Sequence, residues 1–270
     1  MSGTDKLFAG SIPDIYDDCL VPLIFETYAE DLAARVASAA PQAVLEIAAG
    51  TGVISRALAP RLGPGARYVV TDLNQPMLDR AARRQPPDPR ITWQQADAMA
   101  LPFADRSFDA VCCQFGVMFL PDKVQGFREV RRVLRPGGRF FLSVWDRIEE
   151  NVFARRVTET VAGLFPENPP LFLARLPHGY HDVAVLRGDL ESAGFGPVAI
   201  ETVTRQSRAE TPRLPAVAYC QGTPLRAELE ARAPQDLEAI TALCAEDLEA
   251  EFGPGPVSGK IQGHVAVASR

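Results

Sequence analysis

The sequence predicts an α/β fold, with a doubly wound, mostly parallel sheet of seven strands, helices on both faces and a small helical cap. Three observations favour this class. Short β-rich runs alternate with helical stretches between residues 43 and 145. A glycine-rich turn, Gly50-Thr51-Gly52, follows the first of these strands, and the stop signal Arg135-Pro136-Gly137-Gly138 precedes the last. Strands separated by helices indicate parallel βαβ units with right-handed crossovers.

The elements of this block follow one another in a regular order. Five short strands are expected: Ala43–Ala48, Arg67–Thr71, Ile91–Gln95, Ala110–Gln114 and Arg139–Trp145. The helices expected between them are Val53–Leu62, Gln75–Arg84 and Lys123–Leu134. The last of these carries apolar residues at helical spacing, which predicts one face packed on the sheet.

The flanking regions complete the predicted domain. A helix is expected at Pro22–Ala40, and two further strands at Val198–Thr204 and Gly263–Ser269 bring the sheet to seven. Further helices are expected at Asn151–Phe165, Asp182–Ala193, Pro215–Arg232 and Gln235–Glu251. We therefore expect a single domain over residues 1–270, with an N-terminal helical segment, residues 1–40, and two cap segments, residues 149–182 and 208–255.

Composition excludes several classes of partner. The net charge of −6 leaves no global basic field for a polyanion, so we expect no nucleic-acid partner. Arg128, Arg131, Arg132 and Arg135 form either a local basic patch or a solvated helix face. The five cysteines lack metal-ligand spacing, which predicts no metal site and a reduced, cytoplasmic protein. The sequence shows no signal peptide and no apolar run of 18 residues, so no membrane association is expected, and a homodimer stays open.

The turn after the first strand has the features of a ligand-binding loop. Glycines at 50 and 52 allow positive φ and a close approach of the backbone to a ligand. In open α/β sheets, ligands bind at the carboxyl ends of the strands, where this loop lies. Asp72 ends the second strand at the spacing where an acid reaches both ribose hydroxyls, and with the glycine loop upstream this role is favoured over the alternative, a cap on the following helix.

The loop does not fit a dinucleotide fingerprint. That motif needs a third glycine for close packing of helix on strand, and Ser55 stands at its position. The acidic Glu46, at the end of the strand before the glycines, is a second departure. A nicotinamide-dependent oxidoreductase is therefore disfavoured.

Four ordered motifs carry a family resemblance: VLEIAAGTG, VVTDLNQPMLDRA, ADAMALPFADRSFDAV and REVRRVLRPGGRF. Together, over roughly residues 40–145, they resemble the class I S-adenosylmethionine-dependent methyltransferases, particularly the methyltransferase type 11 group. The resemblance implies a Rossmann-like fold and transfer of a methyl group from S-adenosylmethionine to an O, N or C atom of a small molecule. A non-catalytic protein that binds S-adenosylmethionine is the alternative.

The resemblance also implies roles for individual residues. Glu46 would lie near the methionine amino group, Asp72 would hold the ribose, and Asp97 with Ala98 would meet the adenine amino group. The other expected donor contacts are Ala48, Gly50, Gly52, Leu73, Met77, Gln114 and Phe115. For Met77 and Phe115, the alternative role is packing in the core. For Asp97, the alternative role is capping of the turn that follows it. The family usually has glycine where Ala48 stands, which puts the detailed loop geometry in question.

The sequence indicates less about the residues that face the methyl acceptor. Tyr16 is a candidate aromatic contact for the cationic donor, because related enzymes fold this segment over it. A base is needed only where the acceptor must lose a proton, and His178 and His181 are then the candidate catalytic residues. His264, in the last strand, is expected to be structural. The two cap segments would lie on the acceptor side.

Overall fold

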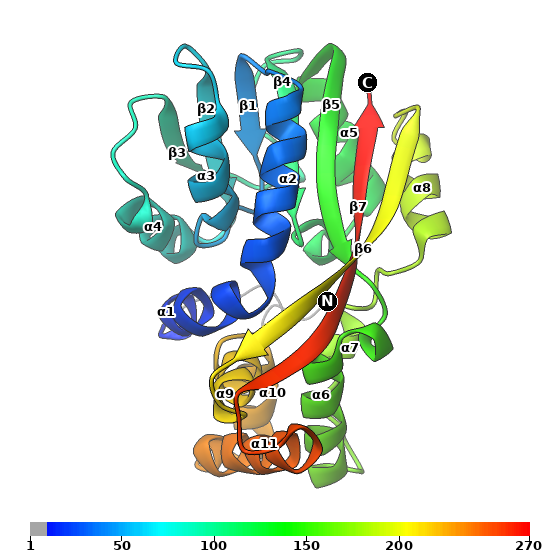
Figure 1. Cartoon of the computed structure of the whole chain (residues 1–270). Coiled ribbons are helices and arrows are strands. Elements are labelled where there is room, and N and C mark those ends of the chain that lie inside the picture. The colour runs from blue at the N-terminus through cyan, green and yellow to red at the C-terminus, as the bar shows by residue number, and fades with distance from the viewer. Residues whose placement is uncertain (1–9) are drawn as a thin grey trace. The chain divides into compact units, whose positions relative to one another are not determined.

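The computed structural model describes residues 10–270 and contains one seven-stranded sheet of order β3-β2-β1-β4-β5-β7-β6 (Figure 1). The strands are β1 (Ala43–Glu46), β2 (Arg67–Asp72), β3 (Ile91–Gln95), β4 (Phe108–Gln114), β5 (Leu134–Trp145), β6 (Val198–Ala209) and β7 (Val257–Ser269). β1 pairs in parallel with β2 and β4, β2 with β3, and β4 with β5. The predicted fold class is confirmed.

β7 is the one reversed strand among those described. Its last residue, Ser269, exchanges backbone hydrogen bonds with Gly196 and Pro197 at the start of β6, and Arg270 does the same with Gly137 and Gly138 near the start of β5. Both pairings therefore run antiparallel. On the other side of the sheet the strand order reverses between β1 and β4, and the carboxyl ends of strands at such a switch point are where α/β folds bind ligands.

Helices occupy most of the chain between the strands. The α-helices are α1 (Ile12–Ile15), α2 (Glu26–Ser38), α3 (Val53–Leu58), α4 (Gln75–Arg84), α5 (Lys123–Val133), α6 (Val152–Leu164), α7 (Phe172–Arg175), α8 (Val183–Ser192), α9 (Arg213–Gln221), α10 (Leu225–Arg232) and α11 (Leu237–Phe252). A π-helical segment, η2 (Tyr16–Phe25), joins α1 to α2, and short 3₁₀ turns are η3 (Ala59–Arg61), η4 (Val117–Phe119) and η5 (Ile148–Glu150).

The chain packs into two compact units. Unit 1 comprises Met1–Phe25, Trp145–Gly179 and Thr204–Gln262; unit 2 comprises Glu26–Val144, Tyr180–Val203 and Gly263–Arg270. The expected cap segments, residues 149–182 and 208–255, fall in unit 1 except for residues 180–182. The expected N-terminal segment is divided between the units, and its first nine residues lie outside those described.

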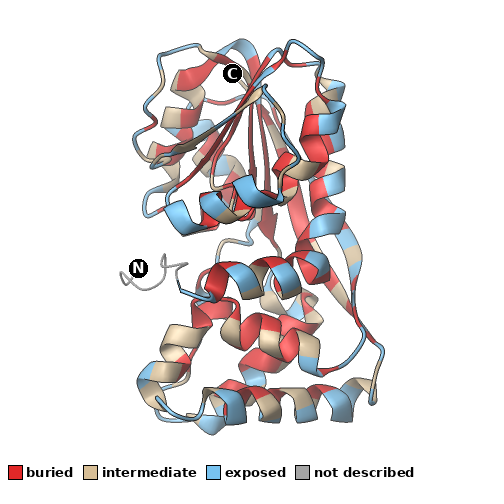
Figure 2. Ribbon diagram, turned by 90° about the vertical axis from the view of Figure 1, so that its left-hand side faces the viewer, coloured by how far each residue is buried: buried red, intermediate tan, exposed pale blue. Residues whose placement is uncertain are grey.

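Unit 2 has a continuous apolar core around its parallel strands. β1 and β4 are buried along almost their whole length, as the red strands in Figure 2 show. In Figure 1, α2 crosses in front of the sheet, where it packs on α3 and β4, and α5 lies behind β5 and packs on α8. The buried Tyr28 of α2 donates a hydrogen bond of 2.8 Å to the carbonyl of Val203, which ties this helix to β6.

Unit 1 is mainly helical. α11 packs against α6 and α9, and α9 also contacts η2 and α10. The buried thiols of Cys220 (α9) and Cys244 (α11) lie 3.7 Å apart, and like the other three cysteines they are not in a disulfide. None of the helices in residues 10–270 is both long and apolar enough to cross a membrane.

Several elements differ from the sequence expectation. The single helix expected at Pro215–Arg232 is two helices, because Gly222 ends α9 and Pro224, which has no N–H group, stands at the start of α10. β6 and β7 are longer than expected, since beyond Thr204 and before Gly263 they pair with each other in unit 1. Side-chain hydrogen bonds such as Thr204 Oγ1 to Gln262 Oε1 (2.7 Å) join them there.

Arg131 and Arg132 at the end of α5, and Arg135 at the start of β5, form hydrogen bonds and ion pairs within unit 2. Arg132 donates to the carbonyls of Leu101 and Phe103 and pairs with Glu129 and Asp105. Arg135 pairs with Asp109, and Arg131 donates to the carbonyl of Gly194. These side chains therefore hold neighbouring loops of unit 2 in place.

Candidate functional site

The loop between β1 and α3 has three residues at positive φ. Ala48, Gly50 and Gly52 have φ of 51°, 57° and 80°. The N–H of Gly50 donates a hydrogen bond of 2.8 Å to Asp72 Oδ2, and the N–H of Ala49 donates to the carbonyl of Thr71 at 3.0 Å. The end of β2 thus holds the loop at the carboxyl edge of the sheet, as the sequence predicts.

Ala48 is an exception to the usual preference for glycine in this conformation. The left-handed region costs an L-residue roughly 1–2 kcal/mol. Its methyl group occupies a defined place, because a Cβ built on Gly116 would lie only 2.5 Å from Ala48 Cβ and 2.8 Å from Cys113 Sγ. The alanine in the loop and the glycine after β4 are therefore complementary in shape.

Gly52 is required by packing as well as by backbone angle. It stands directly before α3, and a Cβ at this position would lie 2.9 Å from Ala81 Cβ on α4. A side chain here would strain the backbone and push against a second helix. The structure thus explains the second glycine of the loop by contacts within unit 2.

Asp72 accepts hydrogen bonds on both carboxylate oxygens. Oδ2 accepts from the N–H of Gly50, and Oδ1 accepts from the N–H and the side-chain amide of Asn74, at 2.8 and 3.4 Å. Its side chain is almost fully buried. Burial raises the pKa of Asp72, while the N–H donors of Asn74 and Gly50 oppose this shift. The carboxylate therefore organises both the loop and the start of α4.

Glu46, the last residue of β1, is buried within a network of hydroxyl groups. Its Oε2 accepts hydrogen bonds from Ser55 Oγ of α3, at 2.7 Å, and from the hydroxyl of Tyr68 of β2. Desolvation raises the pKa of Glu46 to about 7, against the opposing effect of these two donors. Sequence reasoning missed both partners, because Tyr68 has the pattern of an ordinary core residue of a strand.

The residues expected around adenine differ in exposure. Leu73, directly after β2, is 43% exposed, which leaves it accessible to a ligand. Met77 is buried in α4. Asp97 is exposed and accepts a 2.9 Å hydrogen bond from the N–H of Met99, so it caps its own turn, and Ala98 follows it half-buried.

The end of β4 carries a second strained residue. Phe115 has φ of 49°, is buried, and packs edge-to-face on Tyr28 with ring centroids 5.1 Å apart. Gln114, before it, is half-buried. Phe115 thus belongs to the core of unit 2, and strain of this kind is a feature of functional sites.

The loop region suits a nucleoside that carries an amino-acid end. The hydroxyl of Thr51 is buried and has no hydrogen-bond partner within residues 10–270, which is unusual for a buried polar atom. The positive φ values bring the backbone close to a ligand, and the carboxylates of Asp72 and Glu46 match ribose hydroxyls and an ammonium group. The residues present therefore fit S-adenosylmethionine.

The aromatic and histidine candidates divide between the units. In unit 1, Tyr16 stacks on Phe25 with ring centroids 5.2 Å apart, Phe25 lies 5.9 Å from Trp145, and Trp145 lies 5.9 Å from His178. His181 is exposed and belongs to unit 2. His264 is buried, 3.0 Å from Thr202 Oγ1 through its Nδ1.

The buried His178 has a defined tautomer. Its Nδ1 lies 2.8 Å from the carbonyl oxygen of Asp146. A carbonyl oxygen only accepts hydrogen bonds, so in the neutral ring Nδ1 carries the proton and Nε2 carries the basic lone pair.

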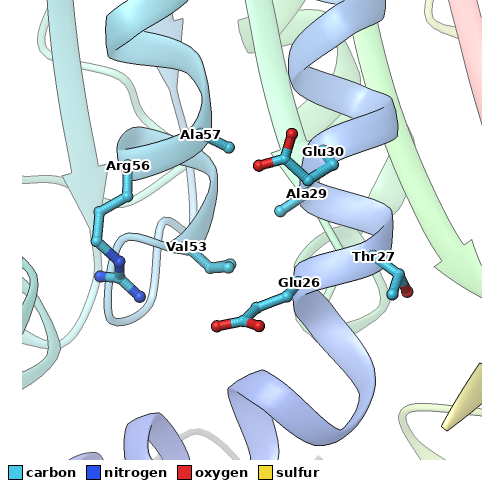
Figure 3. Close-up of a pocket in the computed structure, with 7 residues that line it drawn as sticks. All are labelled: Glu26, Thr27, Ala29, Glu30, Val53, Arg56 and Ala57. Atoms are coloured by element: carbon cyan, nitrogen blue, oxygen red, sulfur yellow. The ribbon is translucent and has the colours of Figure 1, made fainter.

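A pocket of about 400 Å³ lies between α2 and α3 in unit 2. Figure 3 shows Glu26 and Glu30 extending from α2 toward α3, which presents Val53, Arg56 and Ala57. Arg56 also donates a 2.6 Å hydrogen bond to the carbonyl of Thr51 in the glycine loop. The described residues that line this pocket include none of those expected to bind the donor.

Comparisons with known proteins identify methyltransferases among the relatives of this chain. A family model described as a methyltransferase domain matches residues 45–142. A demethylmenaquinone methyltransferase of Clavibacter sepedonicus is 33% identical over 178 residues, which cover 63% of this chain and 71% of that protein. A ubiquinone/menaquinone biosynthesis C-methyltransferase of Hahella chejuensis is 44% identical over 103 residues, covering 37% of this chain and 41% of that protein.

Solved structures show the same fold at low sequence identity. The YcgJ protein of Bacillus subtilis has a TM-score of 0.55 at 18% identity, covering 90% of this chain and 98% of that one. A Haemonchus contortus phosphoethanolamine N-methyltransferase, solved with S-adenosylhomocysteine, has a TM-score of 0.53 at 17% identity, covering 98% of this chain and 61% of that one. The chain belongs to the class I S-adenosylmethionine-dependent methyltransferases, and S-adenosylmethionine is its cofactor.

Proposed function

We propose that this methyltransferase acts on a carbon atom of a small hydroxylated aromatic molecule of the quinol class. Two similar proteins are named for C-methylation of quinone precursors or for demethylmenaquinone methylation, which supports the class of acceptor. The single observation that carries the proposal in this chain is the tautomer of His178. Its Nε2 is the basic atom of a ring that lies beside Trp145.

We assign the donor-binding residues to unit 2. Asp72 holds the ribose hydroxyls, Glu46 meets the ammonium of the amino-acid end, and Ala48, Gly50 and Gly52 let the backbone approach between them. Leu73, Met77, Asp97 and Ala98 surround the adenine, and Gln114 and Phe115 flank the donor at the end of β4. The donor supplies a methyl group already activated on a sulfonium, so these residues need only bind, align and exclude water.

The base in this scheme is His178. Removing the proton from an acceptor hydroxyl places negative charge on the oxygen and on the ring carbons ortho and para to it, one of which then attacks the methyl group. As the new carbon–carbon bond forms, the carbon–sulfur bond breaks; the proton on the methylated carbon then moves to the oxygen, which restores the aromatic ring and the hydroxyl group, and the proton taken by the base passes to solvent. His178 Nε2 takes up the hydroxyl proton, a role that contributes roughly 10²–10⁴-fold to rates of this kind.

We place the acceptor-side cap in residues 149–182 and 208–255. These segments contribute α6, α7 and α9–α11, and unit 1 has the aromatic cluster Tyr16, Phe25, Trp145 and His178. Flat aromatic faces suit a ring-shaped acceptor. Tyr16, half-buried at the end of this cluster, is our candidate for contact with the sulfonium.

The first test is an acceptor screen with the full chain. The protein is incubated with S-adenosylmethionine and, separately, with a naphthoquinol, a catechol and a primary amine. S-adenosylhomocysteine is quantified, and the position of the new methyl group is read by NMR. Carbon methylation of the quinol is expected. Transfer to the amine or to a catechol oxygen alone would contradict the proposed acceptor class.

The second test addresses the base. His178→Gln is expected to lower kcat for the quinol about 100-fold while leaving the affinity for S-adenosylmethionine unchanged. His264→Gln is the matched control, because both histidines are 5% exposed and make one described hydrogen bond through Nδ1. Equal losses of kcat in both variants would assign His178 a structural role. A loss confined to His181→Gln would move the base to that residue.

A further inference from the structure

The hydroxyl network around Glu46 joins three separate elements of unit 2. Glu46 ends β1, Tyr68 lies in β2 and Ser55 lies in α3, and the three side chains are at most 1% exposed. Both hydroxyl groups donate to the same carboxylate oxygen, Oε2. The hydroxyl of Thr71 further donates to the backbone carbonyl of Glu46 at 2.8 Å. The position of the carboxylate is therefore defined by its neighbours and not by solvent.

The surroundings favour neither protonation state completely. Burial raises the pKa of Glu46 to about 7, and the nearby Asp72 of β2 adds to this effect. The hydroxyls of Tyr68 and Ser55 and the guanidinium of Arg56 on α3 lower it. The thiols of Cys112 and Cys113 in β4 are neutral near pH 7. Burial raises the pKa of both, that of Cys113 to about 12.

A carboxylic acid buried beside the glycine loop is a useful receptor for a cation only when it is ionised. Hydrogen bonds donated to the charged form stabilise that form. Removing such donors while leaving the packing intact should therefore favour the protonated acid. Tyr68 and Ser55 provide these donors. Within residues 10–270, no other residue donates a hydrogen bond to the side chain of Glu46.

We propose that Tyr68 and Ser55 are positioning residues that hold Glu46 ready to ionise for the ammonium group of the donor, so that donor binding releases a proton from Glu46. This inference rests on the proposed contact between Glu46 and the amino-acid end of the donor. It adds two residues that do not touch the donor and a proton linkage to the binding step. Affinity for the donor then rises with pH up to the pKa of Glu46.

Calorimetry of the full chain with S-adenosylhomocysteine tests this linkage. Titrations at pH 7 in buffers of different ionisation enthalpy should show release of about half a proton per site, rising toward one at pH 6. Tyr68→Phe should weaken binding about fivefold at pH 7 and hardly at all at pH 9.5, as expected when the pKa of Glu46 rises by about one unit. Turnover should show a higher KM for the donor at pH 7 with unchanged kcat.

Tyr28→Phe is the matched control. Tyr28 is as buried as Tyr68 and lies in the same unit, but its hydroxyl donates to the neutral carbonyl of Val203. This variant should keep both the affinity and the pH profile of the wild type. An equal loss at all pH values in both tyrosine variants would mean that Tyr68 acts only through packing, which would overturn the proposal.

Two further variants keep the test decisive if Tyr68→Phe does not fold. Ser55→Ala should shift the pH profile in the same direction, and Glu46→Gln should abolish proton release and remove the pH dependence of affinity. Tight binding by the wild type without proton release would overturn this inference and leave the methyltransferase function intact. Absence of binding would instead overturn the proposed donor site itself.

Discussion

At the scale of single residues, the carboxylates that end β1 and β2, Glu46 and Asp72, have different roles. Asp72 accepts backbone N–H groups from the glycine loop and from the start of α4, so its charge organises the chain around it. Glu46 accepts only hydroxyl groups among the described hydrogen bonds, and its pKa of about 7 makes it the residue whose state changes near neutral pH. Both are buried, and they differ in the groups that donate hydrogen bonds to them.

Asp72→Ala should weaken binding of S-adenosylmethionine at least tenfold, or about 1.4 kcal/mol. The substitution removes the proposed ribose acceptor. It also leaves the N–H groups of Gly50 and Asn74 without their acceptor, which should lower the free energy of unfolding by roughly 1–3 kcal/mol. Calorimetry and urea denaturation measure the two effects separately. Wild-type donor affinity in a folded Asp72→Ala variant would refute the ribose assignment.

Glu46→Gln should change how stability depends on pH. The folded pKa of Glu46 is raised above its ordinary value, so the folded state retains the proton that the unfolded state loses. Its contribution to stability is therefore present below about pH 4.5 and is lost as the pH rises through 7. Relative to the glutamine variant, the free energy of unfolding of the wild type should fall by about 3 kcal/mol across this window.

The measurement is chemical denaturation of the apo protein at several pH values, with the two proteins compared at each. Comparison removes the contributions of all other titrating groups, which the proteins share. A difference in unfolding free energy that stays constant from pH 4.5 to 8 would show that Glu46 ionises normally in the folded chain.

At the scale of elements, the glycine loop depends on the turn after β4. Ala48 holds a positive φ that alanine disfavours, and its methyl group fills the space that Gly116 leaves open. The loop and the turn are joined through shape, because close-packed interiors transmit small changes in volume to their neighbours. A substitution in the glycine loop should therefore change the packing of the turn after β4, and a substitution in the turn should change the packing of the loop.

Gly116→Ala should lower the free energy of unfolding by about 1–3 kcal/mol, because the added methyl overlaps Ala48 Cβ and Cys113 Sγ. Adding Ala48→Gly should restore part of this loss, since one of the two overlaps disappears. Thermal and urea denaturation of the two single variants and the double variant give the coupling between the positions. Strict additivity of the two changes would show that the elements are independent.

At the scale of the whole molecule, the sheet order places the glycine loop, Asp72 and Gln114 at the carboxyl ends of β1, β2 and β4. The reversal of strand order between β1 and β4 is what opens this edge to a ligand. Unit 2 contains this edge, while unit 1 contains most of the two proposed cap segments.

A ligand that binds the folded chain should raise its Tm. S-adenosylmethionine or S-adenosylhomocysteine at about 100 times its Kd stabilises the native state by about 2.7 kcal/mol. For a chain of this size the rise should be roughly 5–10 °C. NAD⁺ and NADP⁺ serve as controls and should leave Tm unchanged, because Ser55 replaces the third glycine of their fingerprint. A rise with the nicotinamide cofactors alone would contradict the donor assignment.

The sequence by itself determined the order and type of the elements in the parallel block. Gln75–Arg84 and Ile91–Gln95 match the structure residue for residue, since helical periodicity, short β-rich runs and Gly-Pro punctuation are local signals. The glycine loop and Asp72 were also predictable, because the turn and the strand end each carry their own signature. These features depend on neighbouring residues along the chain.

Tertiary structure alone decided the features that depend on residues far apart in the sequence. Tyr68 reaches Glu46 across 22 positions because β1 and β2 pair in a register that sets them two residues apart, with Tyr68 opposite Val44 and Val70 opposite Glu46. The contact of Ala48 with Gly116, the burial of His178 against the exposure of His181, and the extension of β6 and β7 arise in the same way. Packing and strand register create these contacts, and no local pattern encodes them.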